Sequence, residues 1–172
     1  RDRLAAWISA RAGGTASPEP GGGIMSGPPE THSRTTVSPD WTVATGGMAA
    51  ATPQAAAAGA DLFILCVGND EDVRQVVTAA LETAPHGCVF VDHTTTSARL
   101  AREMADLADK TRCAFVDAPV SGGQAGAENG QLSVMAGGDA DALARALPAL
   151  EAYSKAVQHM GPVGSGQLTK MV

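Results

Sequence analysis

The stretch Asp61-Leu-Phe-Ile-Leu-Cys-Val67, which ends at Gly68, is a continuous apolar run, and it decides the fold. A run without polar alternation predicts a strand that is covered on both faces, as the strands of a parallel sheet are. In the next segment, 70–81, apolar residues recur at helical spacing, and acidic residues occupy the first turn, where the helix dipole favours negative charge. The two segments together predict a strand followed by a helix, which is the repeating unit of an α/β fold.

The same alternation of strand and helix continues towards the carboxyl terminus. Further strands are predicted by short apolar runs at 88–91, 113–116 and 132–135. Further helices are predicted over 97–110 and from Asp139 onward, because Ser97 and Asp139 are good helix caps. In parallel α/β sheets, ligands bind at the carboxyl ends of the strands. The strand tips that could form a site are 67–70, 92–97 and 117–123.

The composition restricts the class of protein. A chain of 172 residues fits one domain with one core. The net charge is -6, no Lys/Arg cluster occurs and no apolar run is long enough to span a membrane, so neither nucleic acid nor a membrane is an expected partner. The three cysteines are dispersed, which is typical of reduced thiols in the cytoplasm, and the histidines show no metal-ligand spacing. We therefore expect a cytoplasmic globular protein without a metal site.

Residues 1–45 differ in kind from the rest of the chain. Clusters such as Ser17-Pro-Glu-Pro-Gly-Gly-Gly23 cannot hold a helix or a strand, because Pro removes backbone donors and Gly costs backbone entropy. Only residues 3–11 fit a short helix. The composition therefore predicts an irregular leader over 1–45, an α/β domain over 46–163 and the start of a further helix at 164–172.

Four motifs follow one another in the orderly part of the chain. They read Val91-Asp-His-Thr-Thr-Thr-Ser97, Phe115-Val-Asp-Ala-Pro-Val-Ser-Gly-Gly123, Ala125-Gly-Ala-Glu-Asn-Gly130 and Gly161-Pro-Val-Gly-Ser-Gly-Gln-Leu-Thr-Lys170. In this order and at this spacing, they resemble the signatures of the β-hydroxyacid dehydrogenases, the family that includes 3-hydroxyisobutyrate dehydrogenase and is related to 6-phosphogluconate dehydrogenase. The resemblance covers residues 46–172 and implies a Rossmann-like NAD(P)-binding domain.

The resemblance also implies roles for residues at the strand tips. It implies that Lys170 is the general acid/base of the reaction. It assigns the carboxyl end of the substrate to Ser121, Gly122 and Gly123, and the nicotinamide side of the cofactor to Val67, Asn69 and Thr95. The residue types fit, since a Ser-Gly-Gly turn can aim N–H groups at a carboxylate, and a lysine that burial makes neutral can exchange a proton.

Each of these residues also has an ordinary structural explanation. Taken alone, Ser-Gly-Gly is a glycine turn, Asn69 and Thr95 are residues that cap or bend the backbone, and a lysine is normally a solvated charge. His93 beside Asp92 invites a charge-relay interpretation. No motif places a Ser or Cys nucleophile next to this pair, so a structural role is predicted for His93.

The resemblance is incomplete at both ends. Family members begin with a strand, a Gly-x-Gly-x-x-Gly turn and a helix, and the turn lets the cofactor pyrophosphate approach the helix. The glycine cluster at 21–27 has the spacing Gly-x-Gly-x-x-x-Gly and follows prolines rather than a strand, so it does not predict a phosphate loop. Family members also continue past the position of Val172 into an all-helical domain that forms the dimer. The predicted fold is therefore a partial Rossmann-like parallel sheet that lacks its first βαβ unit and the all-helical domain, with a homo-oligomer expected only for the full-length family protein.

A shift of the reading frame is one hypothesis for the unusual leader. Residues 1–45 have about the length of a strand-turn-helix-strand unit. A one-nucleotide shift through GC-rich codons turns 17–23 into a segment that resembles the family's first helix. The hypothesis places the end of the shift before Thr45-Gly-Gly47, and the coding DNA would test it.

The functional prediction is a fragment of an NAD(P)-dependent oxidoreductase that interconverts a small 3-hydroxy acid, of the 3-hydroxyisobutyrate type, and its semialdehyde. Two alternatives stay open: a tartronate semialdehyde (2-hydroxy-3-oxopropionate) reductase, or a non-catalytic binding module derived from the family. The choice between NAD and NADP cannot be read, because the residue that selects between them falls in the segment 1–45. Without a phosphate loop, we expect cofactor binding to be weak or lost and this chain to be inactive.

Overall fold

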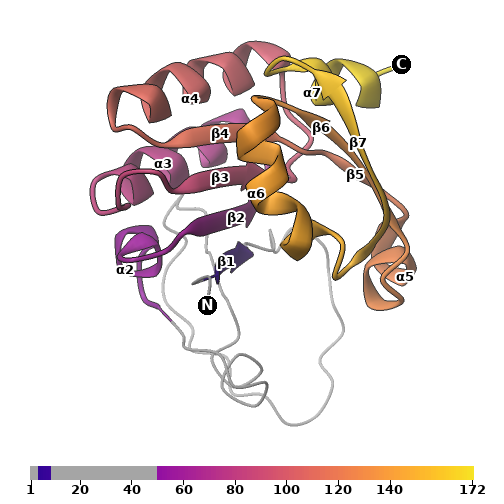
Figure 1. Ribbon diagram of the computed structural model, residues 1–172, viewed down its shortest axis with the longest axis horizontal. Coiled ribbons are helices and arrows are strands. Elements are labelled where there is room, and N and C mark those ends of the chain that lie inside the picture. Colours follow the sequence, from indigo (N-terminus) through magenta and orange to yellow (C-terminus); the bar gives the residue numbers. More distant parts are fainter. Residues whose placement is uncertain (1–3, 9–49) are drawn as a thin grey trace, which may run out of the picture.

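The computed structural model describes residues 4–8 and 50–172, which form a seven-stranded sheet with helices on both faces (Figure 1). The strands are β1 (Leu4–Ile8), β2 (Leu62–Cys66), β3 (Val89–Asp92), β4 (Ala114–Asp117), β5 (Val120–Ser121), β6 (Leu132–Gly137) and β7 (Ser154–Gly161). The helices are α2 (Pro53–Ala57), α3 (Asp70–Leu81), α4 (Ala98–Lys110), α5 (Gly123–Glu128), α6 (Ala140–Leu150) and α7 (Ser165–Lys170). No helix among the described residues is long and apolar enough to cross a membrane.

The first half of the sheet is parallel, with the strand order β1-β2-β3-β4. The second half is mixed, because β6 runs antiparallel to β4 and β5 and parallel to β7. The prediction of a purely parallel sheet is therefore wrong for β5 and β6. Only two residues separate β4 from β5, whereas a parallel connection needs a crossover of a dozen or more. An apolar run carries no information on strand direction, so the sequence pattern could not reveal the reversal.

The predicted helices and their caps are confirmed. Helix α3 covers the predicted span, and its apolar positions are buried. The Ser97 hydroxyl accepts a hydrogen bond from the Leu100 N–H at 3.1 Å and so begins α4. The Asp139 carboxylate accepts from the N–H groups of Asp141 and Ala142, both at 3.0 Å, at the start of α6. Local side-chain capping thus fixes where these helices start.

The predicted short helix at 3–11 is wrong over Leu4–Ile8, which forms β1. This strand pairs in parallel with β2, from Leu4 opposite Leu62 to Ile8 opposite Cys66. Pairing with a neighbouring strand outweighs the modest helix propensity of an alanine-containing pentapeptide. The rest of the predicted irregular leader, 9–45, lies outside the described residues.

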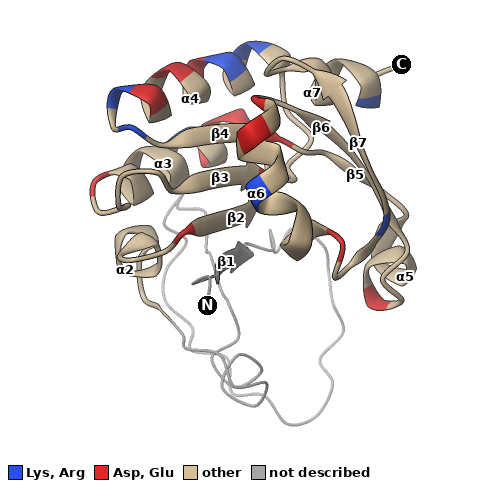
Figure 2. Ribbon diagram, in the orientation of Figure 1, with Lys and Arg blue, Asp and Glu red and all other residues tan. Residues whose placement is uncertain are grey.

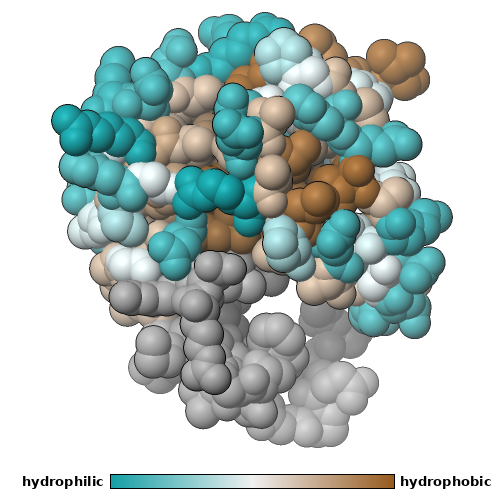
Figure 3. Space-filling model, in the orientation of Figure 1, coloured by the Kyte–Doolittle hydropathy of each residue, from teal (hydrophilic) through white to brown (hydrophobic). Residues whose placement is uncertain are grey.

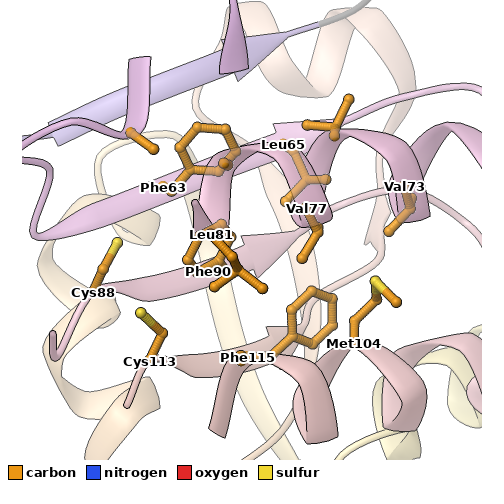
Figure 4. Close-up of a cluster of buried hydrophobic side chains, with 14 of the residues drawn as sticks. Phe63, Leu65, Val73, Val77, Leu81, Cys88, Phe90, Met104, Cys113 and Phe115 are labelled. Carbon is orange, nitrogen blue, oxygen red and sulfur yellow. The ribbon is translucent and has the colours of Figure 1, made fainter. Parts of the chain in front are cut away.

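The core lies on both faces of the sheet, as the apolar run of β2 predicts. On one face, Phe63 and Leu65 pack with Phe90, Phe115 and residues of α3 and α4 (Figure 4). On the other face, a second buried cluster joins the opposite side chains of β2, β3 and β4 to α6. Two of the cysteines are buried within the first cluster and the third is half-buried, so all three behave as small core residues.

The surface is charged over the outer helices and apolar near the carboxyl terminus. Acidic and basic side chains line α4 (Figure 2), and Arg74 of α3 forms a two-pronged ion pair with Glu103 of α4, at 2.7 and 3.0 Å. Apolar atoms gather where Figure 1 marks the C-terminus (Figure 3), and Leu168, Met171 and Val172 are exposed there. The strand tips lie between these two kinds of surface.

Candidate active site

The carboxyl ends of β2, β3 and β4 meet at one edge of the sheet. Leu65 lies opposite Asp92, and Asp92 lies opposite Asp117, in the register of the parallel strands. The two aspartates are almost completely buried. The three predicted tips are therefore neighbours, and two buried carboxylates lie beneath them.

The β2 tip is held by hydrogen bonds to its own helix and to the β3 tip. The Val67 N–H donates to the Thr94 hydroxyl at 2.9 Å. The Asn69 side chain caps α3, because its oxygen accepts from the N–H groups of Glu71 at 2.9 Å and Asp72 at 3.0 Å. The capping explanation for Asn69 therefore applies to its side chain, whatever its backbone contributes.

The β3 tip forms a loop of three threonines, 94–96, between Asp92 and α4. The Thr94 N–H donates to the Asp92 carboxylate at 2.9 Å. Thr95 is exposed, whereas Thr94 and Thr96 are buried on either side of it. Thr95 is thus the residue of this loop that a ligand on the open edge would meet first.

The β4 tip fixes the helix that carries Lys170. The Asp117 carboxylate accepts from the Gly164 N–H at 2.6 Å and from the Gln167 N–H at 2.9 Å. Burial raises the pKa of Asp117, and these backbone N–H bonds oppose the rise. A Cβ on Gly166 would lie 2.2 Å from the Met135 carbonyl oxygen, so only glycine allows α7 to approach the sheet this closely.

Gln167 joins α7 to the threonine loop, and sequence reasoning missed it. Its side chain is fully buried, its oxygen accepts from the Thr96 N–H at 3.0 Å, and its nitrogen donates to the Thr94 carbonyl at 2.7 Å. These bonds span 71 and 73 residues of sequence. No local pattern encodes a contact of that range, although the position of Gln167 within the motif 161–170 could have drawn attention to it.

The other predicted site residues lie around the same edge. Ser121 pairs with Ser133 of β6, and the carbonyl of Met135, two residues further along β6, faces α7. Ser121, Gly122 and Gly123 are exposed, and both glycines have positive φ, at 133° and 60°. Lys170 is the last residue of α7 and is half-buried. Strand β6 therefore brings the Ser-Gly-Gly turn and the lysine helix onto adjacent segments.

His93 has structural contacts rather than catalytic ones. Its Nδ1 lies 2.6 Å from the Ala118 carbonyl oxygen, which can only accept, so Nδ1 carries the proton. Its Nε2 then accepts from the Tyr153 hydroxyl at 2.7 Å. Burial lowers the pKa of His93 and raises that of Tyr153, which favours the neutral pair. The arrangement ties β3 and β4 to the segment after α6.

Thr96→Val is expected to raise the free energy of unfolding by about 1–2 kcal/mol. The Thr96 hydroxyl is buried and has no partner among the described residues, and an unpaired buried hydroxyl costs roughly 1–3 kcal/mol. Urea unfolding of the variant would measure the gain. Thr111→Val is the control, since the Thr111 hydroxyl donates to the Ala108 carbonyl at 2.8 Å and its loss is expected to be neutral or destabilising. A destabilised Thr96→Val protein would instead point to a bound water at that hydroxyl.

The fold and the strand-tip site define a dinucleotide-binding domain of the Rossmann class. Residues 30–161 match the model described as the NAD binding domain of 6-phosphogluconate dehydrogenase, and the chain belongs to that family. The match begins upstream of residue 46, where the sequence pattern places the domain boundary. The predicted family and the predicted Rossmann-like fold are therefore confirmed.

Three similar proteins illustrate the relationship. An uncharacterized oxidoreductase of Shewanella frigidimarina is 52% identical over 135 residues, which are 77% of this chain and 46% of that protein. The structure of Mycobacterium tuberculosis 3-hydroxyisobutyrate dehydrogenase with L-serine is 37% identical, with a TM-score of 0.71, over 78% of this chain and 47% of that one. A structure with NADP+ and the ligand 2-OPP is 25% identical, with a TM-score of 0.72, over 77% and 48%. The chain therefore spans about half the length of these relatives.

Proposed function

We propose that this chain is the cofactor-side part of an NAD(P)-dependent 3-hydroxy acid dehydrogenase, of the kind that interconverts 3-hydroxyisobutyrate and its semialdehyde. The observation that carries the proposal is the anchoring of α7 by Asp117, which holds a lysine-bearing helix against the strand tips. The 37% identical M. tuberculosis enzyme supports it by name, and its structure was solved with L-serine, which is itself a 3-hydroxy carboxylic acid.

In this proposal, Lys170 exchanges the proton of the reaction. It gives a proton to the carbonyl oxygen of the semialdehyde, or accepts one from the hydroxyl group in the reverse direction. NAD(P), when bound, supplies or accepts the hydride. The exposed Ser121 hydroxyl and the backbone N–H groups of Gly122 and Gly123 bind the substrate carboxylate.

The described strand tips fit the nicotinamide half of the cofactor rather than its pyrophosphate. At the start of α3, the Asn69 side chain already accepts from two N–H groups, and the acids of 70–72 repel phosphate. The exposed Thr95 and the half-buried Val67, in contrast, carry no charge and lie on the open edge. We therefore assign Val67, Asn69 and Thr95 to the nicotinamide side, with Asn69 acting chiefly by holding the β2 tip in place.

A chimera tests the proposal directly. Residues 50–172 would replace the matching segment of the M. tuberculosis enzyme, and the product would be assayed with 3-hydroxyisobutyrate and either NAD+ or NADP+. Turnover supports a dehydrogenase, and the ratio of the two rates identifies the preferred cofactor. Faster reduction of tartronate semialdehyde than of methylmalonate semialdehyde would favour the reductase alternative. A folded chimera without turnover on any of these would favour the non-catalytic module.

The chain by itself is expected to show no measurable NAD(H) binding in calorimetry. Strand β1 is followed by Ser9-Ala-Arg-Ala-Gly-Gly14, which lacks the Gly-x-Gly-x-x-Gly spacing that brings backbone N–H groups to a pyrophosphate. The acids at the start of α3 offer no substitute. The active chimera, which has a complete phosphate loop, is the positive control. Micromolar affinity of the unmodified chain would contradict this expectation.

A further inference from the structure

We infer that Gln167 is a positioning residue that couples the threonine loop on the cofactor side to the helix of the proton-exchanging lysine. The inference rests on the proposed function for the identity of the two sides. Its geometric part, the coupling itself, stands on the hydrogen bonds of the described residues. It concerns a residue that acts through Thr95 and Lys170 rather than one that touches the substrate.

The Gln167 amide holds both neighbours of Thr95. Its oxygen accepts from the N–H of Thr96, and its nitrogen donates to the carbonyl of Thr94, at 3.0 and 2.7 Å. The orientation of the amide is unambiguous, because an N–H can only donate and a carbonyl can only accept. The exposed Thr95 therefore sits at the apex of a loop that is fixed on both sides by one side chain.

The same residue is fixed at its backbone. The Gln167 N–H donates to Asp117 at 2.9 Å, and the side chain has no exposed surface. Lys170 follows three residues later on α7, and residues three apart lie on neighbouring positions of one helix face. A displacement of the threonine loop is therefore transmitted to α7 through one fully buried amide, and a displacement of α7 is transmitted to the loop.

A purely structural glutamine would not need this arrangement. A buried amide adds roughly 1 kcal/mol per hydrogen bond, and an apolar side chain of the same shape can replace it with little net loss once both partners find other bonds. Here both partners are main-chain groups beside the proposed cofactor residue, so they cannot be replaced together by substitution. The structural role predicts a change in stability alone, whereas the positioning role predicts linked changes at Thr96 and Lys170.

The test uses the unmodified chain and the variants Gln167→Met and Gln167→Glu, without cofactor. Hydrogen exchange of the Thr96 amide reports on the loop. The rate of amine labelling at Lys170, followed by mass spectrometry, reports on α7. The chain has three lysines, so Lys110 and Lys155 are internal references. Gln124→Met is the control substitution, because Gln124 is exposed on α5 and bonds only to Glu128.

Gln167→Met is expected to speed exchange at Thr96 about tenfold and to raise Lys170 labelling several-fold relative to both reference lysines, because both bonds of the amide are lost. Gln167→Glu gives a pH-dependent rescue. A protonated carboxyl group can donate to the Thr94 carbonyl and accept from the Thr96 N–H, whereas the carboxylate can only accept. Compared with the unmodified chain at the same pH, this variant is expected to match it in acid and to approach the methionine variant in alkali.

Two results would overturn the inference. One is exchange and labelling within twofold of the unmodified chain in a folded Gln167→Met protein. The other is a Gln167→Glu protein whose loop and lysine respond independently of each other as pH changes, and this arm decides the matter if the methionine variant does not fold. Neither result bears on whether Lys170 is catalytic, because no turnover is measured. Failure of the coupling and failure of the proposed function are therefore separate outcomes.

Discussion

Lys170→Ala is expected to lower kcat of the chimera about 10²–10⁴-fold, the usual contribution of a positioned general acid. When the carbonyl accepts a hydride, its oxygen gains negative charge, and a proton donor stabilises that charge only as it develops. The loss therefore falls on kcat more than on the Michaelis constants. The positive charge of the lysine also polarises the carbonyl, so the loss can exceed this range.

Steady-state kinetics with 3-hydroxyisobutyrate would measure the effect, and two further variants make it specific. Lys155→Ala is the matched control, because Lys155 is exposed on β7 and carries the same charge. Ser121→Ala is expected to raise the Michaelis constant of the substrate, since its proposed partner is a carboxylate that is present in the ground state and the transition state alike. A Lys170→Ala protein with near-normal kcat would remove the central catalytic assignment.

The local part of the architecture could be predicted from the sequence. Helical spacing and capping residues place α3, α4 and α6, because a helix is held by bonds between residues four apart and begins where a side chain satisfies its first N–H groups. The run from Asp61 to Val67 gives β2 for a similar reason. A strand buried on both faces needs apolar residues at every position.

The non-local part could not be predicted in this way. Strand β7 is mostly exposed along its length, so no apolar run announces it. Strand β1 depends on pairing with β2, which lies more than fifty residues away. The network of Asp117 and Gln167 depends on side-chain bonds to backbone groups that lie 47–73 residues away. Motif resemblance pointed to the right segments, but only the folded chain identifies which members of each motif hold the others.

The buried carboxyl of Asp92 is expected to make the protein less stable as the pH rises from about 4 to about 7. Desolvation raises the pKa of Asp92 from 3.8 to about 7, although the Thr94 N–H stabilises the charged form, and the neighbouring Asp117 and Asp70 add to the rise. Within this window the folded protein keeps the proton and the unfolded chain has released it. The free energy of unfolding therefore falls as pH increases, by up to roughly 1.4 kcal/mol per pH unit.

Asp92→Asn isolates this effect, because asparagine keeps an oxygen that can accept from the Thr94 N–H but has no proton to lose in this range. In urea unfolding between pH 4 and pH 8, the stability of the variant relative to the unmodified chain is expected to grow by about 4 kcal/mol and to level off above pH 7. Asp109→Asn, at an exposed position of α4, is the control. Carboxyl groups common to both proteins, including Asp117, cancel in the difference. If the difference stayed constant with pH, Asp92 would be charged throughout in the folded protein. It would then need a compensating donor beyond Thr94 at the point where β3 meets the proposed nicotinamide site.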